Sequence, residues 1–268
     1  MSEALQRYPL PEEEQQALLR ASMASEGLIL GAGLIVAVVF SVAQSGLAHA
    51  LPFGWLTDIA ATMKPHWAML ALPIAMLAIL EAVDWLGGRF SERYRQAIMD
   101  TRQGVTGELP RMRAGSIVAC MAAAGICEEL LFRYGLLGLA LLGLRMFLPA
   151  PIAAIVAVVL VSAAFTAVHV QYRSVWTLSL VAAISCLLGG VYLATGSLLC
   201  VMFGHAAYNI AELALERYKM VREPDYFDGK VPVDIMMKTL HPSRHDDGTN
   251  DPFPSPVDSD ADSKQNLD

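Results

Sequence analysis

Three clusters of side chains that could do chemistry interrupt long apolar stretches of this sequence. Each cluster has helical spacing: Glu128-Glu129 with Arg133, Phe165 with His169, and His205 with Asn209. An ionisable residue inside a membrane span costs roughly 2.5–3.5 kcal/mol on insertion scales, and such residues are therefore functional candidates by default.

The first cluster separates one paired carboxylate from one free carboxylate. Residues four apart lie on the same face of a helix, so Glu129 and Arg133 are predicted to form an intrahelical ion pair. Glu128 is rotated by about 100° at 3.6 residues per turn. It is therefore left to face another helix, where a free carboxylate can take a proton from water as a general base.

The two histidine clusters could complete a site around this carboxylate. If their helices pack together, we expect Glu128, His169, His205 and Asn209 to converge on one polar pocket at membrane depth. A carboxylate with histidines can activate water directly, or through a Zn²⁺ held by Glu128, His169 and His205. His205 or Asn209 could then stabilise the oxyanion of an acyl intermediate.

Each cluster also has a purely structural interpretation. A single histidine in a membrane is more often an interhelical hydrogen-bonding residue than a catalyst. The pair of Glu129 and Arg133 could simply order packing, and Phe165 is most simply a core residue. The joint pattern favours function, because the same stretch of apolar sequence has very few other ionisable residues.

The composition indicates a membrane protein. The chain has 268 residues, of which 55% are hydrophobic and 17% charged, whereas soluble domains average about 25% charged. The net charge of −7 comes almost entirely from the C-terminal part, since residues 222–268 contain eleven acids and five bases. These features exclude a basic nucleic-acid binder, a wholly disordered chain and a disulfide-rich secreted module.

The apolar runs predict an all-α, polytopic transmembrane helical bundle. A helix needs about 20 apolar residues to cross a bilayer. The runs that qualify are 27–49, 66–87, 114–148, 150–170, 175–196 and 198–217. Because 114–148 is too long for one straight span at ~1.5 Å per residue, the sequence predicts six spans or, if this run divides, seven.

Four segments follow from these runs. They are a polar N-terminal segment 1–26, two accessory helices with a loop over 27–113, a catalytic core over 114–217, and an acidic, largely disordered tail over 218–268. Six arginines lie between the second and third runs, and the positive-inside rule makes this loop cytoplasmic. With six spans both termini are then cytoplasmic, in a plasma or inner membrane.

The three clusters resemble the motifs EExxxR, FxxxH and HxxxN of the CAAX-protease and bacteriocin-processing (CPBP, or Abi) family of intramembrane proteases. The resemblance covers roughly residues 114–213. It implies that Glu128 activates water with His169 beside it, that Glu129 and Arg133 support them, and that His205 and Asn209 bind the oxyanion. The family is commonly labelled metalloprotease, but a metal-independent glutamate route is also proposed for it, and both alternatives stay open here.

Three functions are compatible with this pattern. The first is an intramembrane endopeptidase, similar to a CAAX prenyl endopeptidase, acting on a membrane-embedded or lipidated protein or peptide. The second is a non-catalytic scaffold or immunity-type protein that uses the pocket for binding, which the intact motifs disfavour. The third is a transporter or proton relay, but paired broken helices, the usual sign of a transporter, are not evident in the sequence.

Overall fold

The computed structural model describes residues 10–103, 105–170 and 175–222, and these residues form helices without a β-strand. The main elements are α2 (Glu12–Ser45), α3 (Leu47–His49), η1 (Ala50–Gly54), α4 (Trp55–Thr62), α5 (Ala68–Phe90), α6 (Glu92–Gln103), η2 (Val105–Arg111), α7 (Ala114–Glu129), η3 (Leu130–Leu136), α8 (Leu137–Leu144), α9 (Ala150–Ala167), α10 (Val175–Thr195) and α11 (Leu198–Arg222). Six of the helical runs are long and apolar enough to cross a membrane. The predicted all-α transmembrane bundle is confirmed.

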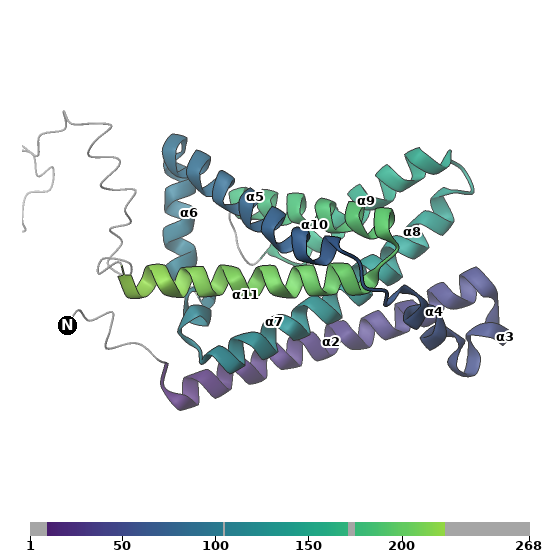
Figure 1. The fold of residues 1–268 in the computed structure, drawn as a ribbon, viewed down its shortest axis with the longest axis horizontal. Coiled ribbons are helices and arrows are strands. Elements are labelled where there is room, and N and C mark those ends of the chain that lie inside the picture. Colours follow the sequence, from purple (N-terminus) through teal and green to yellow (C-terminus); the bar gives the residue numbers. More distant parts are fainter. Residues whose placement is uncertain (1–9, 104, 171–174, 223–268) are drawn as a thin grey trace, which may run out of the picture.

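The long run after residue 114 is one span. α7, η3 and α8 follow one another without a break over Ala114–Leu144, a length of 31 residues. Their common axis runs obliquely to α11 (Figure 1), and tilt is how a bilayer accommodates a long hydrophobic helix. The described residues therefore contain six candidate spans and not seven.

The first span is longer than the sequence predicts. We predicted a polar segment over 1–26 and an apolar span from residue 27, but α2 is a single 34-residue helix from Glu12 to Ser45. Three glutamates occupy its first turn, where negative charge is favoured by the helix dipole. Gly46 ends it with a φ of 87°, in the region open to glycine. The predicted boundary at residue 26 is therefore no break in structure.

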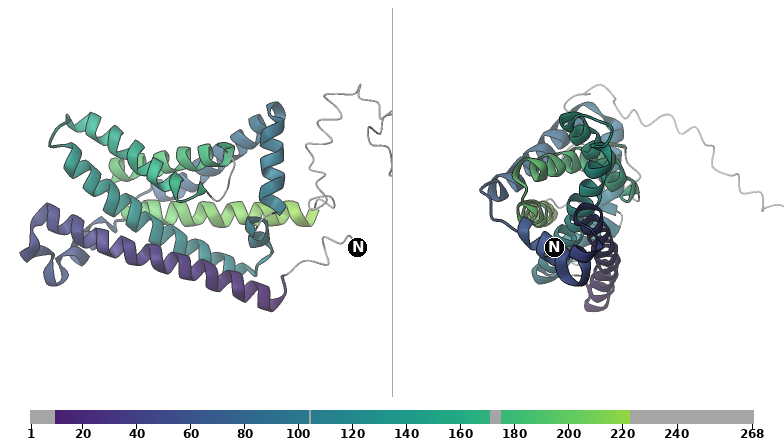
Figure 2. Two further views of the ribbon diagram at one scale, coloured as in Figure 1. Left: turned by 180° about the vertical axis from the view of Figure 1, so that it is seen from behind. Right: turned by 90° about the vertical axis from the view of Figure 1, so that its right-hand side faces the viewer.

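The helices pack in two groups. α2 lies beside α7 and η3, and α11 lies between α7 and α5, as Figure 1 and the reverse view in Figure 2 both show. α9 packs against α10 and α8. α9 and α11 both contact η3, so the three motif-bearing elements meet at η3.

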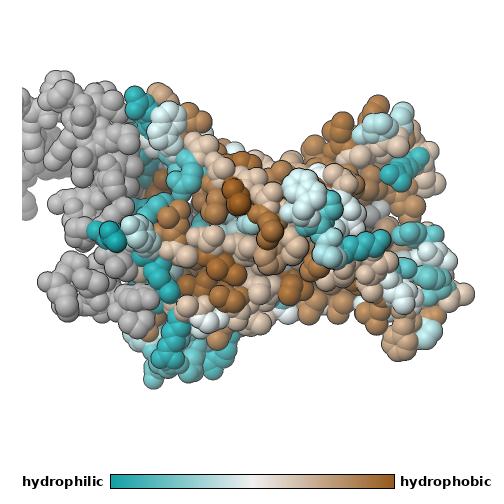
Figure 3. Space-filling view, viewed as in Figure 1, coloured by the Kyte–Doolittle hydropathy of each residue, from teal (hydrophilic) through white to brown (hydrophobic). Residues whose placement is uncertain are grey.

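The outside of the bundle is apolar between two more polar ends. Figure 3 shows hydrophobic residues across the middle of one face and hydrophilic residues toward both ends. Large exposed aromatic side chains lie near the ends of the spans: Trp67 and Phe147 near one end, Trp85 and Phe90 near the other. Aromatic residues favour the membrane–water interface, so this distribution fits helices that cross a bilayer.

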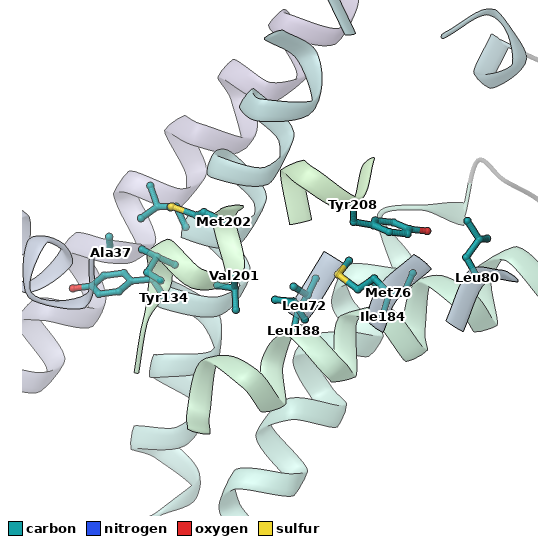
Figure 4. Packing of buried hydrophobic residues seen from close by; sticks show 12 residues of the cluster. Ala37, Leu72, Met76, Leu80, Tyr134, Ile184, Leu188, Val201, Met202 and Tyr208 are labelled. Atoms are coloured by element: carbon teal, nitrogen blue, oxygen red, sulfur yellow. The ribbon is translucent and has the colours of Figure 1, made fainter. Parts of the chain in front are cut away.

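Inside the bundle, one cluster of buried apolar side chains joins α2, α5, η3, α10 and α11. Most of its members are labelled in Figure 4, among them Ala37 on α2, Met76 on α5 and Leu188 on α10. Tyr134 from η3 packs against it beside the ring of Phe40. This cluster holds the motif-bearing elements in register.

The polar end near the arginine-rich loop is ordered by specific contacts. The Tyr94 hydroxyl on α6 donates to the Asp84 carboxylate on α5. Burial and that carboxylate raise the pKa of Tyr94, so the hydroxyl stays a donor. Arg217 on α11 donates to the carbonyl of Pro110 at 2.8 Å. The basic loop and the C-terminal end of α11 therefore lie at the same end of the bundle, as the charge pattern predicts.

The predicted tail begins later than expected. α11 continues to Arg222, so residues 218–222 are helical although we assigned them to the disordered tail. The reason is that Lys219 and Arg222 fall in the last turn of α11, where cations interact favourably with the helix dipole. The rest of the predicted tail, 223–268, lies outside the described residues.

Candidate active site

The first motif spans the end of α7 and the beginning of a π-helical segment. Glu128 and Glu129 are the last residues of α7, and Arg133 lies in η3. Arg133 donates from Nη1 to Glu129 Oε1 at 2.9 Å, and the two side chains are 1% and 0% exposed. The predicted intrahelical ion pair is therefore present and fully buried. Short π-helical segments inside α-helices occur frequently at functional sites.

Arg133 also ties two other helices to this pair. Its Nη2 donates to Ser185 Oγ at 2.9 Å and to the Ser185 carbonyl at 3.3 Å on α10. Its guanidinium carbon lies 4.6 Å from the centre of the Phe165 ring on α9, which is a cation–π contact. Arg133 is thus the common neighbour of η3, α9 and α10, and its charge is compensated mainly by Glu129.

His205 on α11 lies between the two glutamates. Its Nδ1 is 2.8 Å from Glu129 Oε1, and its Nε2 is 3.9 Å from Glu128 Oε2. A carboxylate paired with arginine only accepts hydrogen bonds, so Nδ1 carries the hydrogen and donates it. In the imidazolium form Nε2 also carries a hydrogen, which points toward Glu128. The 3.9 Å separation is too long for a hydrogen bond and suits a bridging water.

A missing side chain lets α11 come this close to α7. A Cβ built on Gly125 would lie 2.9 Å from the Met202 carbonyl oxygen and 2.9 Å from the Ala206 backbone nitrogen. Only glycine fits such an approach without displacing backbone. Gly125 stands one turn before Glu129, and Ala206 follows His205. The close contact therefore sets the register that places the histidine against both glutamates.

The second motif contacts the site through the ring of Phe165. Phe165 is 3% exposed, and its ring centre lies 4.9 Å from that of Phe132, 4.6 Å from His169 and 6.2 Å from His205. His169 Nδ1 is 2.8 Å from the Phe165 carbonyl oxygen, and it donates, because a carbonyl only accepts. Phe165 is thus the core residue expected, and it also joins His169 to the site.

Asn209 lies one turn beyond His205 on α11 and is half-buried. Among the described residues its side chain makes no hydrogen bond. The spacing of four residues places it on the same helical face as His205. Its predicted role toward an oxyanion, like the placement of His169 beside Glu128, remains a prediction.

Two residues that contact or approach the site were not predicted. Ser185 is one of several small polar residues in α10, and nothing in its spacing marks it as a partner of Arg133. Glu26 on α2 is 9% exposed and lies close enough to Glu128 and His205 to interact electrostatically with both. We assigned Glu26 to the polar N-terminal segment, because it stands at the edge of the first apolar run.

The proposed zinc ligands do not form a zinc site in this arrangement. Among the described residues, no group of three His, Cys, Asp or Glu side chains is placed to hold a metal ion. Glu128 Oε2 and His205 Nε2 face each other. His205 Nδ1, however, is 2.8 Å from Glu129 Oε1, and the ring of His169 packs on the ring of Phe165. Catalytic zinc takes three protein ligands, so the residues as placed do not fit the metal.

The three motifs fall within a region that matches a known family. The family is described as Type II CAAX prenyl endopeptidase Rce1-like, and its model matches residues 110–211. Residues 110–211 are thus similar to this family. No match to the chain was found among curated proteins or among solved structures.

The Rce1-like match confirms the resemblance drawn from the motifs. It starts just before α7 and ends two residues after Asn209, so it contains all three clusters. At the family level it indicates a protease, and with six candidate spans it indicates an integral, multi-pass membrane protein. α2 and α5 lie outside the matched range, although both pack against it.

Proposed function

We propose that this protein is an intramembrane endopeptidase that hydrolyses a peptide bond of a membrane-associated protein or peptide. One observation carries the proposal: three buried ionisable side chains from two helices converge inside an apolar bundle. Glu128, Glu129 and His205 are 8%, 0% and 6% exposed. Burying charges is costly unless they are paired, and among the described residues Glu128 makes no hydrogen bond and has His205 at 3.9 Å as its ion-pair neighbour, so its burial is explained by chemistry better than by stability.

In the proposed reaction, Glu128 is the general base. A water between Glu128 Oε2 and His205 Nε2 gives its proton to Glu128, and its oxygen forms a bond to the substrate carbonyl carbon. The carbonyl π electrons move to oxygen and make an oxyanion. When the oxyanion collapses, the C–N bond breaks and Glu128 returns the proton to the leaving nitrogen. The sum is peptide plus water to carboxylic acid and amine.

Glu129 and Arg133 position this chemistry without taking part in it. Glu129 accepts from Arg133 and from His205 through the same oxygen, and therefore fixes the imidazole orientation. His205 and Asn209 share a helical face, and we assign them to the oxyanion that develops on the substrate, His205 as a donor through Nε2–H. His169, stacked on Phe165, is assigned to the water on the side of α9.

The depth of the site suits cleavage within the membrane. Glu128 is the fifteenth residue of a 31-residue span, or about 20 Å from the start of that helix at ~1.5 Å per residue. With the arginine-rich end in the cytoplasm, substrates would be cleaved from the cytoplasmic half. The description of the matched family makes a C-terminal peptide behind a prenylated cysteine the first substrate class to test.

The test compares wild type with Glu128→Gln. We expect wild type to cleave an internally quenched peptide that carries an S-farnesyl cysteine followed by three residues, or to change the membrane peptides detected by mass spectrometry in cells. Glu128→Gln should abolish either signal while leaving insertion intact. Glu81→Gln, at a carboxylate that is 53% exposed, is the matched control. Full activity in Glu128→Gln would refute the proposal.

Metal dependence is tested separately. Zinc bound at one equivalent per chain in the purified protein, with cleavage lost on chelation, would show that Glu128, His169 and His205 come together in another arrangement. Cleavage that persists with chelator would support the route through Glu128 alone.

A further inference from the structure

Glu26 is a buried carboxylate that the motifs do not account for. It lies on α2, outside the matched range 110–211, and is 9% exposed. Its Oε2 is fully buried and has no hydrogen-bond partner among the residues that the structure describes. It lies close enough to Glu128 and to His205 to interact electrostatically with both.

The packing of α2 fixes this position. Gly33 lies against the Leu131 nitrogen, where a Cβ would come within 3.3 Å. Further along, Val36 contacts Gly135 and Phe40 contacts Gly138. α2 and the helical run α7–η3–α8 therefore lie parallel, with a constant offset of about 98 residues between the positions in contact. Glu26 stands two turns before Gly33, which places it level with residue 124, about one turn before Glu128.

The side chains around Glu26 favour a buried water as its hydrogen-bond partner. Glu129 already neutralises Arg133, and the cationic group with which Glu26 interacts is His205, which Glu128 also faces. A buried acceptor without a donor is costly, and a buried water satisfies such groups when two or more polar atoms surround it. Because the register of α2 brings Glu26 within about one turn of Glu128, a water that bridges Glu26 Oε2, Glu128 and His205 Nε2 would satisfy all three.

We propose that Glu26 is a third carboxylate of the active site, which holds the attacking water through Oε2 together with Glu128. This inference rests on the endopeptidase function proposed above. In this arrangement one water hydrogen is directed to Glu128 and the other to Glu26, so a lone pair of the water oxygen is left to attack the substrate. α2 is thereby a catalytic helix and not an accessory one.

The alternative is that Glu26 only packs α2 against the core. The packing contacts of α2 lie at Gly33, Val36 and Phe40, two to four turns away, so a structural role predicts a loss of stability without a change of turnover. A water-holding role predicts a loss of kcat with little change of KM. Gln15 on the same helix is the matched control, because it is 4% exposed and accepts from the Arg113 nitrogen at 2.7 Å, far from the site.

The experiment measures kcat and KM on the farnesylated quenched peptide for wild type, Glu128→Gln, Glu26→Ala, Glu26→Gln and Gln15→Ala. We expect Glu26→Ala to lower kcat on the order of 10- to 100-fold, the effect of one hydrogen bond made to a charged group, with KM within about twofold. Glu26→Gln should recover most of kcat, because the amide oxygen still accepts. Gln15→Ala should leave kcat unchanged.

The outcomes separate this inference from the function on which it rests. If Glu128→Gln is inactive but Glu26→Ala keeps full kcat, or changes only KM or thermal stability, the role of Glu26 is refuted and the proposed function stands. If wild type leaves both the peptide and the membrane peptides unchanged, both fall. If Glu26→Ala does not fold, the kcat values of Glu26→Gln and Glu26→Asp test the inference instead. Asp withdraws the carboxylate oxygen by one methylene, so Glu26→Asp should have the lower kcat. Equal kcat in the two variants would refute the inference.

Discussion

Glu129→Gln is the sharpest perturbation of the buried ion pair. The amide has nearly the same shape and still offers an oxygen, so the substitution removes a charge with little change in packing. In the native site this carboxylate is fully buried, 2.9 Å from Arg133 Nη1 and 2.8 Å from His205 Nδ1. The variant therefore leaves a buried guanidinium without its nearest counter-charge.

The size of the effect follows from the geometry. Opposite charges with centres about 4 Å apart attract by ~4 kcal/mol at an effective dielectric constant of about 20. Removing one partner of a buried pair costs roughly 3–5 kcal/mol. We therefore expect Glu129→Gln to lower the free energy of unfolding by about 3–4 kcal/mol, a factor of roughly 100 to 1,000 in the unfolding equilibrium. Glu81→Gln, at a half-exposed carboxylate 4.0 Å from Lys219, should cost less than about 1 kcal/mol.

The measurement is unfolding in mixed detergent micelles, followed by circular dichroism. A double variant, Glu129→Leu with Arg133→Met, completes the test, because replacing both charges by apolar groups should recover much of the loss. The reasoning is refuted if Glu129→Gln is as stable as wild type, or if the double variant is less stable than Glu129→Gln.

Two further predictions concern the contacts that surround this pair. Gly125→Ala should destabilise the protein by about 1–3 kcal/mol, because the new Cβ would lie 2.9 Å from the Met202 carbonyl oxygen. Gly115→Ala, on the same helix, should not, because no atom lies within 4 Å of its new Cβ. The same unfolding assay compares the two variants, and equal stability would contradict the close approach of α11 to Gly125. Ser185→Ala removes a 2.9 Å hydrogen bond from Arg133 and should cost about 1–3 kcal/mol, with cleavage reduced in proportion to the fraction unfolded; an unchanged unfolding curve would contradict the contact.

How much of the site could be predicted depended on whether a contact is local. The pair of Glu129 and Arg133 follows from spacing within one helix, and the structure confirms it. The approach of His205 to Glu129 depends on the register of α11 against α7, which Gly125 sets through a contact that no spacing rule reveals. Glu26 was missed because a glutamate at the edge of an apolar run looks interfacial, and only the parallel packing of α2 turns it inward.

The arrangement divides the ionisable residues of the site into two kinds. Arg133 and His205 both depend on one oxygen of Glu129, so substituting any of these three should lower stability and turnover together. Among the described residues, the ion-pair neighbour of Glu128 is His205 at 3.9 Å, and Glu26 Oε2 has no hydrogen-bond partner. Since neither stabilises the fold through a pair, neutralising Glu128 should leave the unfolding free energy unchanged or raise it while cleavage is lost. A Glu128→Gln protein that unfolds more easily than wild type would contradict this division, because it would show that the free carboxylate also holds the fold together.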